Sequence, residues 1–154
     1  MNNITKLEKL IQLLETKIQV FDKFNQEVSQ SNVAWHIEHS LLTINGITDF
    51  LVQSNPNNYK WKFKFIRIVV MTMKKIPRGR GKSPKVVQPK DNLSKEHLLN
   101  HLLLTKNKIK ELEHLSKDNY FEHPFFGKLK SKQTLDFLEI HTKHHLEIIE
   151  DIVS

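Results

Sequence analysis

The segment from residue 131 to residue 153 constrains the fold of this chain more than any other. Its apolar side chains recur at helical spacing and, at about 100° per residue, fall on one face of a helix: Thr134, Phe137, Leu138, Ile148, Ile149 and Ile152. The opposite face carries mostly charged residues. This pattern predicts an amphipathic helix, capped at Ser131, that packs against other helices. His141 and His145 fall in the middle of the apolar stripe, where leucines would normally lie.

Similar periodicity predicts helices over residues 4–28, 33–53 and 94–115, and a shorter helix over 62–75. Ser31 or Asn32 can cap the helix over 33–53, and Ser94 can cap the helix over 94–115. Residues 76–91 form a basic loop with three prolines and two glycines, and residues 118–130 form a second loop. Because no convincing strand is found, we predict an all-α bundle with an additional short helix, in one domain spanning 1–154.

The composition excludes several classes of site. The chain of 154 residues has no cysteine, so it has no disulfide, no thiolate ligand and no cysteine nucleophile. It has no apolar stretch of signal-peptide or membrane-spanning length, so we expect a cytoplasmic protein without a membrane partner. The net charge of +7 is concentrated between Lys60 and Lys90. This local excess permits weak binding to anions or nucleic acid without establishing it.

The two histidines on the stripe need partners. A buried imidazole without a partner costs about 1–3 kcal/mol. A shared metal ion would satisfy both rings, because residues four apart on a helix lie about 5–6 Å apart at Cβ. His39 on the predicted helix 33–53 can also face the bundle and act as third ligand. Spacing alone leaves open the other histidines that could take this place: His36, His97, His101 and His114.

Several motifs together resemble the DinB-like (YfiT-like) superfamily of metal-binding proteins. Residues 35–39, Trp-His-Ile-Glu-His, resemble its Trp-His-x-x-His string, and residues 141–145 resemble its C-terminal His-x-x-x-His. The loop strings 76–85 and 123–129 are similar to an uncharacterised bacterial DinB-related subfamily. The resemblance implies a four-helix bundle with one divalent ion bound by three histidines, which here are His39, His141 and His145. It also implies hydrolase or thiol-transferase activity and a homodimer.

Three imidazoles leave a coordination position open for water or a thiol, which is typical of a catalytic site. Zinc or nickel would suit it, and iron or cobalt would fit. The first hypothesis is therefore a metal-dependent hydrolase or a transferase acting with a low-molecular-weight thiol. That thiol must come from the substrate. The alternatives are a nucleic-acid- or anion-binding module that uses loop 76–90, and a metal-binding bundle without catalysis.

Other residues are weaker candidates for a role at the site. Glu38 and Glu147 could act as a general base, but both are expected to be solvated surface residues. His36 and His144 could support the ligands, and aromatic rings could line the mouth of the pocket. The loop could bind an anion through arginine and lysine side chains. The aromatic and basic candidates are Trp35, Phe126, Arg78, Arg80 and Lys82.

Overall fold

The computed structural model describes residues 3–79, 83–90 and 92–154. Most of these residues are helical, and the α-helices are α1 (Asn3–Lys17), α2 (Val33–Gln53), α3 (Phe65–Met73), α4 (Lys95–Lys108) and α5 (Ser131–Val153). A small antiparallel hairpin of β1 (Tyr120–His123) and β2 (Gly127–Lys130) precedes α5. The prediction of a mainly helical fold is confirmed, but the prediction that the chain has no strand was wrong.

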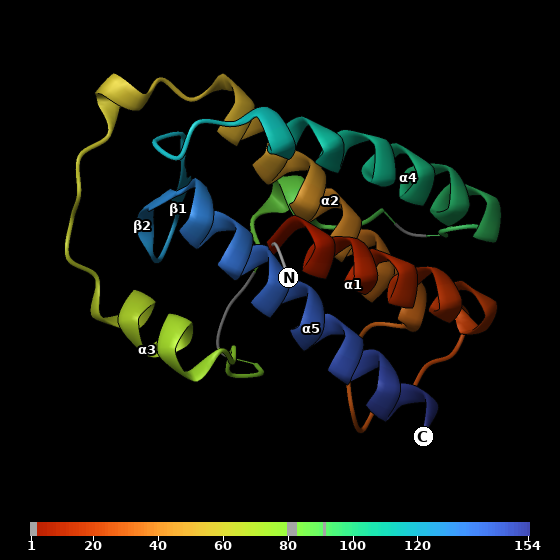
Figure 1. Ribbon diagram of the computed structural model, residues 1–154. Coiled ribbons are helices and arrows are strands. Elements are labelled where there is room, and N and C mark those ends of the chain that lie inside the picture. The colour runs from red at the N-terminus through yellow and green to blue at the C-terminus, as the bar shows by residue number, and fades with distance from the viewer. Residues whose placement is uncertain (1–2, 80–82, 91) are drawn as a thin grey trace.

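Four of the helices lie alongside one another and enclose the core (Figure 1). Helix α1 packs against α4 and α5, and α2 packs against the same two helices. Their inward faces contribute fully buried aliphatic side chains, among them Leu7, Ile11, Ile37, Leu41, Leu98, Leu138 and Ile149. Because α2 has neighbours on two sides, it is buried along most of its length. None of the helices in the described parts of the chain is long and apolar enough to cross a membrane.

Helix α2 begins and ends where the sequence predicts. The side chain of Asn32 accepts a hydrogen bond from the Trp35 amide at 3.0 Å, which satisfies one of the unpaired amides of the first turn. The helix ends at Gln53, just before the turn residues that start at Ser54. Because the cap fixes the first residue of α2, it also fixes which residues near the start of the helix face α5.

The first helix is shorter than predicted. α1 ends at Lys17, and a 3₁₀ turn from Ile18 to Val20 follows it. The chain then folds back so that the carbonyls of Phe21 and Lys23 accept the amides of Ala34 and Val33. These carbonyls therefore serve the start of α2 and cannot continue a helix to residue 28. Val28 matches the apolar spacing of the helix, but it lies after the point where the backbone turns, so the spacing overestimated the length of the helix.

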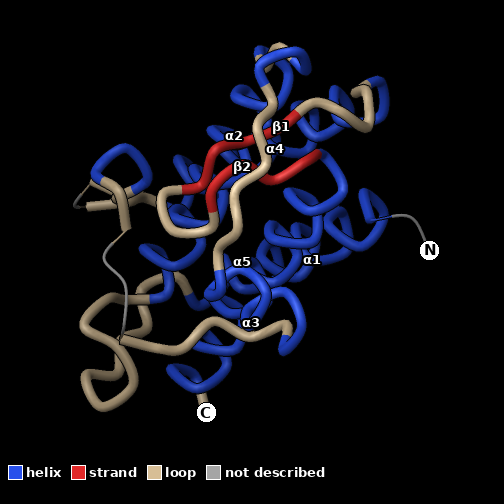
Figure 2. The backbone as a smooth tube through the Cα atoms, turned by 90° about the vertical axis from the view of Figure 1, so that its left-hand side faces the viewer, coloured by secondary structure: helices blue, strands red, loops and turns tan. Residues whose placement is uncertain are grey.

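The loop predicted at 118–130 contains the hairpin. His123 Nδ1 accepts hydrogen bonds from the amides of Phe125 and Phe126, and Gly127 adopts a positive φ of 68°. Leu129, which belongs to β2, is fully buried. Figure 2 shows the two short strands beside the helices. The turn depends on a histidine side chain that mimics a backbone acceptor, which residue periodicity does not reveal.

The end of α4 and the cap of α5 also differ from the predictions in detail. α4 ends at Lys108, and its last turns continue as a 3₁₀ helix to His114. The residue that precedes α5 as its cap is Lys130, whose amide donates to the Gln133 side chain at 3.3 Å. Ser131 is the first helical residue, and its hydroxyl instead donates to the Ser116 carbonyl at 2.7 Å.

The short helix and the basic loop lie outside the four long helices. α3 is shorter than the predicted 62–75, because Lys64 before it is extended and Lys74 after it adopts a left-handed conformation. The Arg67 guanidinium ties α3 to the hairpin by donating to the Lys128 carbonyl at 3.4 Å. The loop that follows contains one 3₁₀ turn, Lys85–Val87, although no regular element was predicted there.

Candidate metal centre

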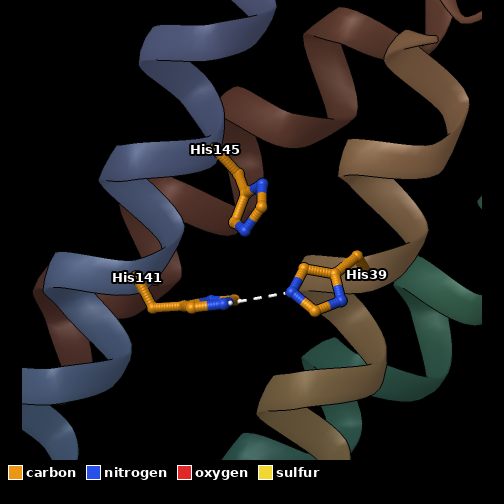
Figure 3. Close-up of side chains that lie close together, drawn as sticks. All are labelled: His39, His141 and His145. Atoms are coloured by element: carbon orange, nitrogen blue, oxygen red, sulfur yellow. Dashed lines mark hydrogen bonds between the residues drawn. The ribbon is translucent and has the colours of Figure 1, made fainter. Parts of the chain in front are cut away.

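Three histidines meet between α2 and α5. His141 and His145 lie one turn apart on α5, and His39 approaches them from α2 (Figure 3). One ring nitrogen from each histidine can be chosen so that all three atoms lie within 4.8 Å of one another. The structure therefore brings His39 to the pair and leaves His36, His97, His101 and His114 outside this group. The role of His39, His141 and His145 as metal ligands stays a prediction.

The orientation of His39 is set by the basic loop. Its Nδ1–H donates to the carbonyl oxygen of Val87 at 2.7 Å. Because a neutral imidazole carries one proton, Nε2 is left with a free lone pair. This atom lies 3.2 Å from Nε2 of His141. The backbone of the loop thus aims the His39 lone pair at the α5 histidines.

His145 is oriented by a second histidine of α2. The Nδ1 atoms of His36 and His145 lie 2.9 Å apart, so one ring donates to the other. His36 Nε2 in turn lies 2.9 Å from the Ser29 hydroxyl. With Nδ1 occupied, the remaining nitrogen of His145 is turned toward the space between His39 and His141 (Figure 3). A histidine bound to metal commonly uses its other nitrogen in this way.

His141 differs from the other two in its support. Its Nδ1 atom is buried and has no hydrogen-bond partner among the described residues. The Phe137 ring lies next to it, with centroids 5.6 Å apart. Its Nε2 is the atom that faces His39, and without an ion it can donate its proton to the His39 lone pair. The position of His141 is therefore determined by packing and by the other site nitrogens.

Burial keeps this group of imidazoles neutral. Desolvation lowers the pKa of His39, and it lowers the pKa of His141 and His145 well below the usual value, with nearby histidines adding to the effect. Desolvation, with neighbouring His39, His144 and Arg78, lowers the pKa of His36 to about 4. A histidine binds metal as the neutral ring, through its unprotonated nitrogen. The electrostatics of the site therefore favour the ligand form near neutral pH.

These residues fit a divalent ion. At zinc–nitrogen distances of about 2.0–2.1 Å, two nitrogens of a tetrahedral site lie about 3.3 Å apart. The 3.2 Å between His39 and His141 matches this spacing. Two of the rings have their far nitrogen held by a hydrogen bond, which directs Nε2 inward. Neutral nitrogen donors suit zinc, nickel, iron and cobalt without choosing among them.

Glu38 contradicts the prediction of a solvated surface residue. Its carboxylate is buried and accepts hydrogen bonds from His97 and His101 of α4, at 3.0 and 2.8 Å. Burial raises its pKa, but the two hydrogen bonds outweigh that effect and the net pKa is lowered. The helical count missed this because α2 is covered by α4 on that side. Glu147 is exposed, as predicted.

The aromatic candidates support the site from its edges. Trp35 stacks on His39, with ring centroids 4.9 Å apart and planes 15° apart. Phe126 is a core residue that stacks on His123 at 4.1 Å and contacts Phe137, so it does not line an open pocket mouth. His144 is half-buried, with its ring 5.2 Å from that of His145.

Of the three basic candidates for anion binding, the structure describes only Arg78. Arg78 forms an ion pair with Asp151 of α5 at 2.8 Å. Arg80 and Lys82 lie outside the described residues. Arg78 also lines a cleft of about 210 Å³ together with His144 and the cations Lys74, Lys75 and Lys143, while Glu147 adds one negative charge. Lys143 is also paired, with Glu139 at 2.6 Å, so the excess of positive charge beside His144 comes mainly from Lys74 and Lys75.

Sequence reasoning missed some of the residues that shape these clusters. Val87 acts through its backbone carbonyl, so no side-chain pattern could identify it. Ser29 lies in a polar turn and acts only because the chain folds back on α2. The pair His97 and His101, by contrast, has the same spacing of four as His141 and His145. That spacing could have identified a second cluster.

Comparison with known proteins gives one match. A model of the family described as "Protein of unknown function (DUF1569)" matches residues 6–152, which includes every histidine discussed above. Neither the curated proteins nor the solved structures gave a significant match.

Proposed function

The chain belongs to the DUF1569 family, and we propose that it is a DinB-like divalent-metal-binding protein that acts as a metal-dependent hydrolase or small-thiol transferase. The observation that carries the proposal is the set of three nitrogens from His39, His141 and His145 that face one another. The mutual packing of α1, α2, α4 and α5 supports the further proposal that this is a DinB-like four-helix bundle.

The chain's own residues prepare the site in three ways. Val87 holds His39 in the tautomer that presents Nε2, and His36 holds His145 from behind. Burial keeps the imidazoles neutral, so that each ring retains one nitrogen with a free lone pair. A zinc or nickel ion bound there would leave a position open for water or a small thiol and would lower the pKa of whichever is bound. Because the chain has no cysteine, a thiol must belong to the substrate.

The charge around His144 supports an anionic substrate. Lys74, Lys75, Arg78 and Lys143 line the cleft there, and their field would attract a carboxylate or phosphate group. The bond between Val87 and His39 brings the basic loop to the histidines. This favours a role for the loop at the site over the alternative of a separate nucleic-acid interface. A homodimer and a cytoplasmic location remain predictions.

The first test is elemental analysis of protein purified without a histidine tag. The wild type is compared with a variant carrying His141→Ala and His145→Ala, and with His114→Ala as a matched control, because His114 is an exposed histidine away from the cluster. We expect the double variant to lack one equivalent of zinc or nickel that the wild type and the control retain. Equal metal in all three proteins, after incubation with each ion, would contradict the proposal.

A second measurement separates the two reactions. Cobalt-loaded protein is mixed with a small thiol, and its absorption spectrum is recorded. A thiolate-to-cobalt charge-transfer band that is absent from the double variant supports the thiol transferase. Loaded protein whose spectrum the thiol does not change supports the hydrolase, in which water takes the open position.

A further inference from the structure

We propose that Glu38, His97 and His101 form a second divalent-metal site, on the face of α2 that packs against α4. One ligand atom of each residue can be chosen so that all three lie within 4.8 Å of one another. The inference does not depend on the proposed function, because no residue is shared between the two clusters. It assigns a ligand role to a buried carboxylate that the first site does not use.

The second cluster repeats the arrangement of the first. In each, α2 supplies one residue and a neighbouring helix supplies two histidines four positions apart. His39 faces α5, and the adjacent Glu38 faces α4, because successive residues of a helix point about 100° apart. Helix α2 packs against both α4 and α5, so it can serve a site on each side.

The donor set has the composition of known transition-metal sites. Two histidines and one carboxylate bind catalytic zinc and non-haem iron in proteins, with open positions left for other ligands. Glu38 Oε1 lies 3.0 Å from His97 Nε2, and Oε2 lies 2.8 Å from His101 Nδ1. A small outward movement of the two rings would bring these separations to those of atoms that share one ion.

Asn45 can adjust to the change in His101 that metal binding requires. The Asn45 amide nitrogen now lies 2.8 Å from His101 Nε2, so Nε2 accepts and Nδ1–H donates to Glu38. To bind an ion through Nδ1, His101 must move its proton to Nε2. The buried Oδ1 of Asn45 has no hydrogen-bond partner within the described parts of the chain, and the amide nitrogen also donates to Thr105 Oγ1 at 2.9 Å. Half a turn of the amide would place it to accept that proton.

Solvent can reach the cluster through His97, whose side chain is 51% exposed, while those of His101 and Glu38 are 12% and 6% exposed. An ion could therefore enter without unfolding α4. Because one ligand is an exposed side chain, this site should bind metal more weakly than the three-histidine site. It should also exchange its ion faster.

The test measures the stoichiometry of zinc alone by equilibrium dialysis and plasma mass spectrometry of untagged protein. The variants are His97→Ala, chosen because an exposed side chain can be removed without opening the core, and Glu38→Gln, which removes the anionic ligand and retains an acceptor. The variant with His141→Ala and His145→Ala removes the first site, and His114→Ala is the matched control. Circular dichroism shows that each variant is folded.

We expect two equivalents of zinc in the wild type and in His114→Ala. His97→Ala and Glu38→Gln should each retain one equivalent, with the affinity of the second site reduced at least tenfold. The double α5 variant should also retain one equivalent, and adding His97→Ala to it should leave none. One equivalent in the wild type, or two in folded His97→Ala and Glu38→Gln, would overturn the proposal. If only the variant with His141→Ala and His145→Ala lost zinc, the second site would be overturned and the first would be supported.

Discussion

The two clusters beside α2 use similar geometry but differ in how their polar atoms are satisfied. Between α2 and α5, neutral rings face one another, and His39 presents a lone pair that only a neighbouring histidine or an ion can use. Between α2 and α4, a carboxylate accepts two hydrogen bonds from histidines. The same helical spacing therefore produces one cluster built of neutral donors and another that already contains a compensated negative charge.

This difference indicates how much each cluster would gain in stability from a bound metal ion. In the first cluster, the buried Nδ1 of His141 has no hydrogen-bond partner among the residues that the structure describes. The Glu38 cluster is stable as a hydrogen-bonded unit, so an ion there would replace bonds that already exist. Metal should accordingly bind the first cluster more tightly, and Glu38 should matter for folding even in metal-free protein.

The largest expected effect tests the structural role of Glu38. In metal-free protein, Glu38→Ala should lower the free energy of unfolding by about 3 kcal/mol, because two hydrogen bonds to a buried charged group are lost. Glu147→Ala on the exposed face of α5 should change it by less than about 0.5 kcal/mol. Urea denaturation of both variants makes the comparison. Equal stabilities would mean that the carboxylate does not support the fold.

The next effect concerns the support of the first cluster. His36→Ala should weaken metal binding by about 10–100-fold, since the partner of His145 Nδ1 is removed while all three proposed ligands remain. His144→Ala should have a smaller effect, because His144 contacts His145 only through its ring edge. Competition with a chromogenic chelator gives both affinities. An unchanged affinity in His36→Ala would show that His145 is held by packing alone.

His123 tests the cost of burying an imidazole that belongs to neither cluster. Burial lowers its pKa to about 4, below the value of about 6.5 in an unfolded chain. The unfolded state therefore takes up a proton first, and the contribution to stability is complete above pH 6.5 and lost as the pH falls toward 4. This difference in pKa corresponds to about 3 kcal/mol over the range, and solvent screening of the half-buried ring reduces the expected loss to about 2 kcal/mol.

The measurement is urea denaturation of metal-free protein between pH 4 and 7. His123→Asn keeps an acceptor for the amides of Phe125 and Phe126 but cannot titrate here. Its stability should therefore depend less on pH than that of the wild type. A parallel decline in both proteins would assign the effect to other groups.

The smallest expected effect sharpens the proposal for the second cluster. Asn45→Ala should weaken zinc binding there by about tenfold, because His101 loses the group that can accept its displaced proton. Binding at the first cluster should not change. Titration of zinc into the variant lacking His141 and His145 measures the second cluster by itself. Equal affinities with and without Asn45 would separate that residue from metal binding.

Local chemistry in the sequence determined much of the helical framework. The Asn32 cap, the turn after Gln53 and the long apolar stripe of residues 131–153 act within a few residues, so α2 and α5 follow from the sequence. The stripe also places His141 and His145 on the inward face. They are four positions apart, and a helix determines that spacing regardless of its neighbours.

Tertiary structure decided what depends on distant segments. α1 ends early because α2 recruits the carbonyls that follow it, and the hairpin forms because a histidine side chain accepts two amides. The burial of Glu38 and the Val87 bond to His39 arise only when α4 and the loop pack against α2. Periodicity reports which face of a helix is apolar. It cannot report which neighbour covers that face, and the neighbour decides which polar groups become partners.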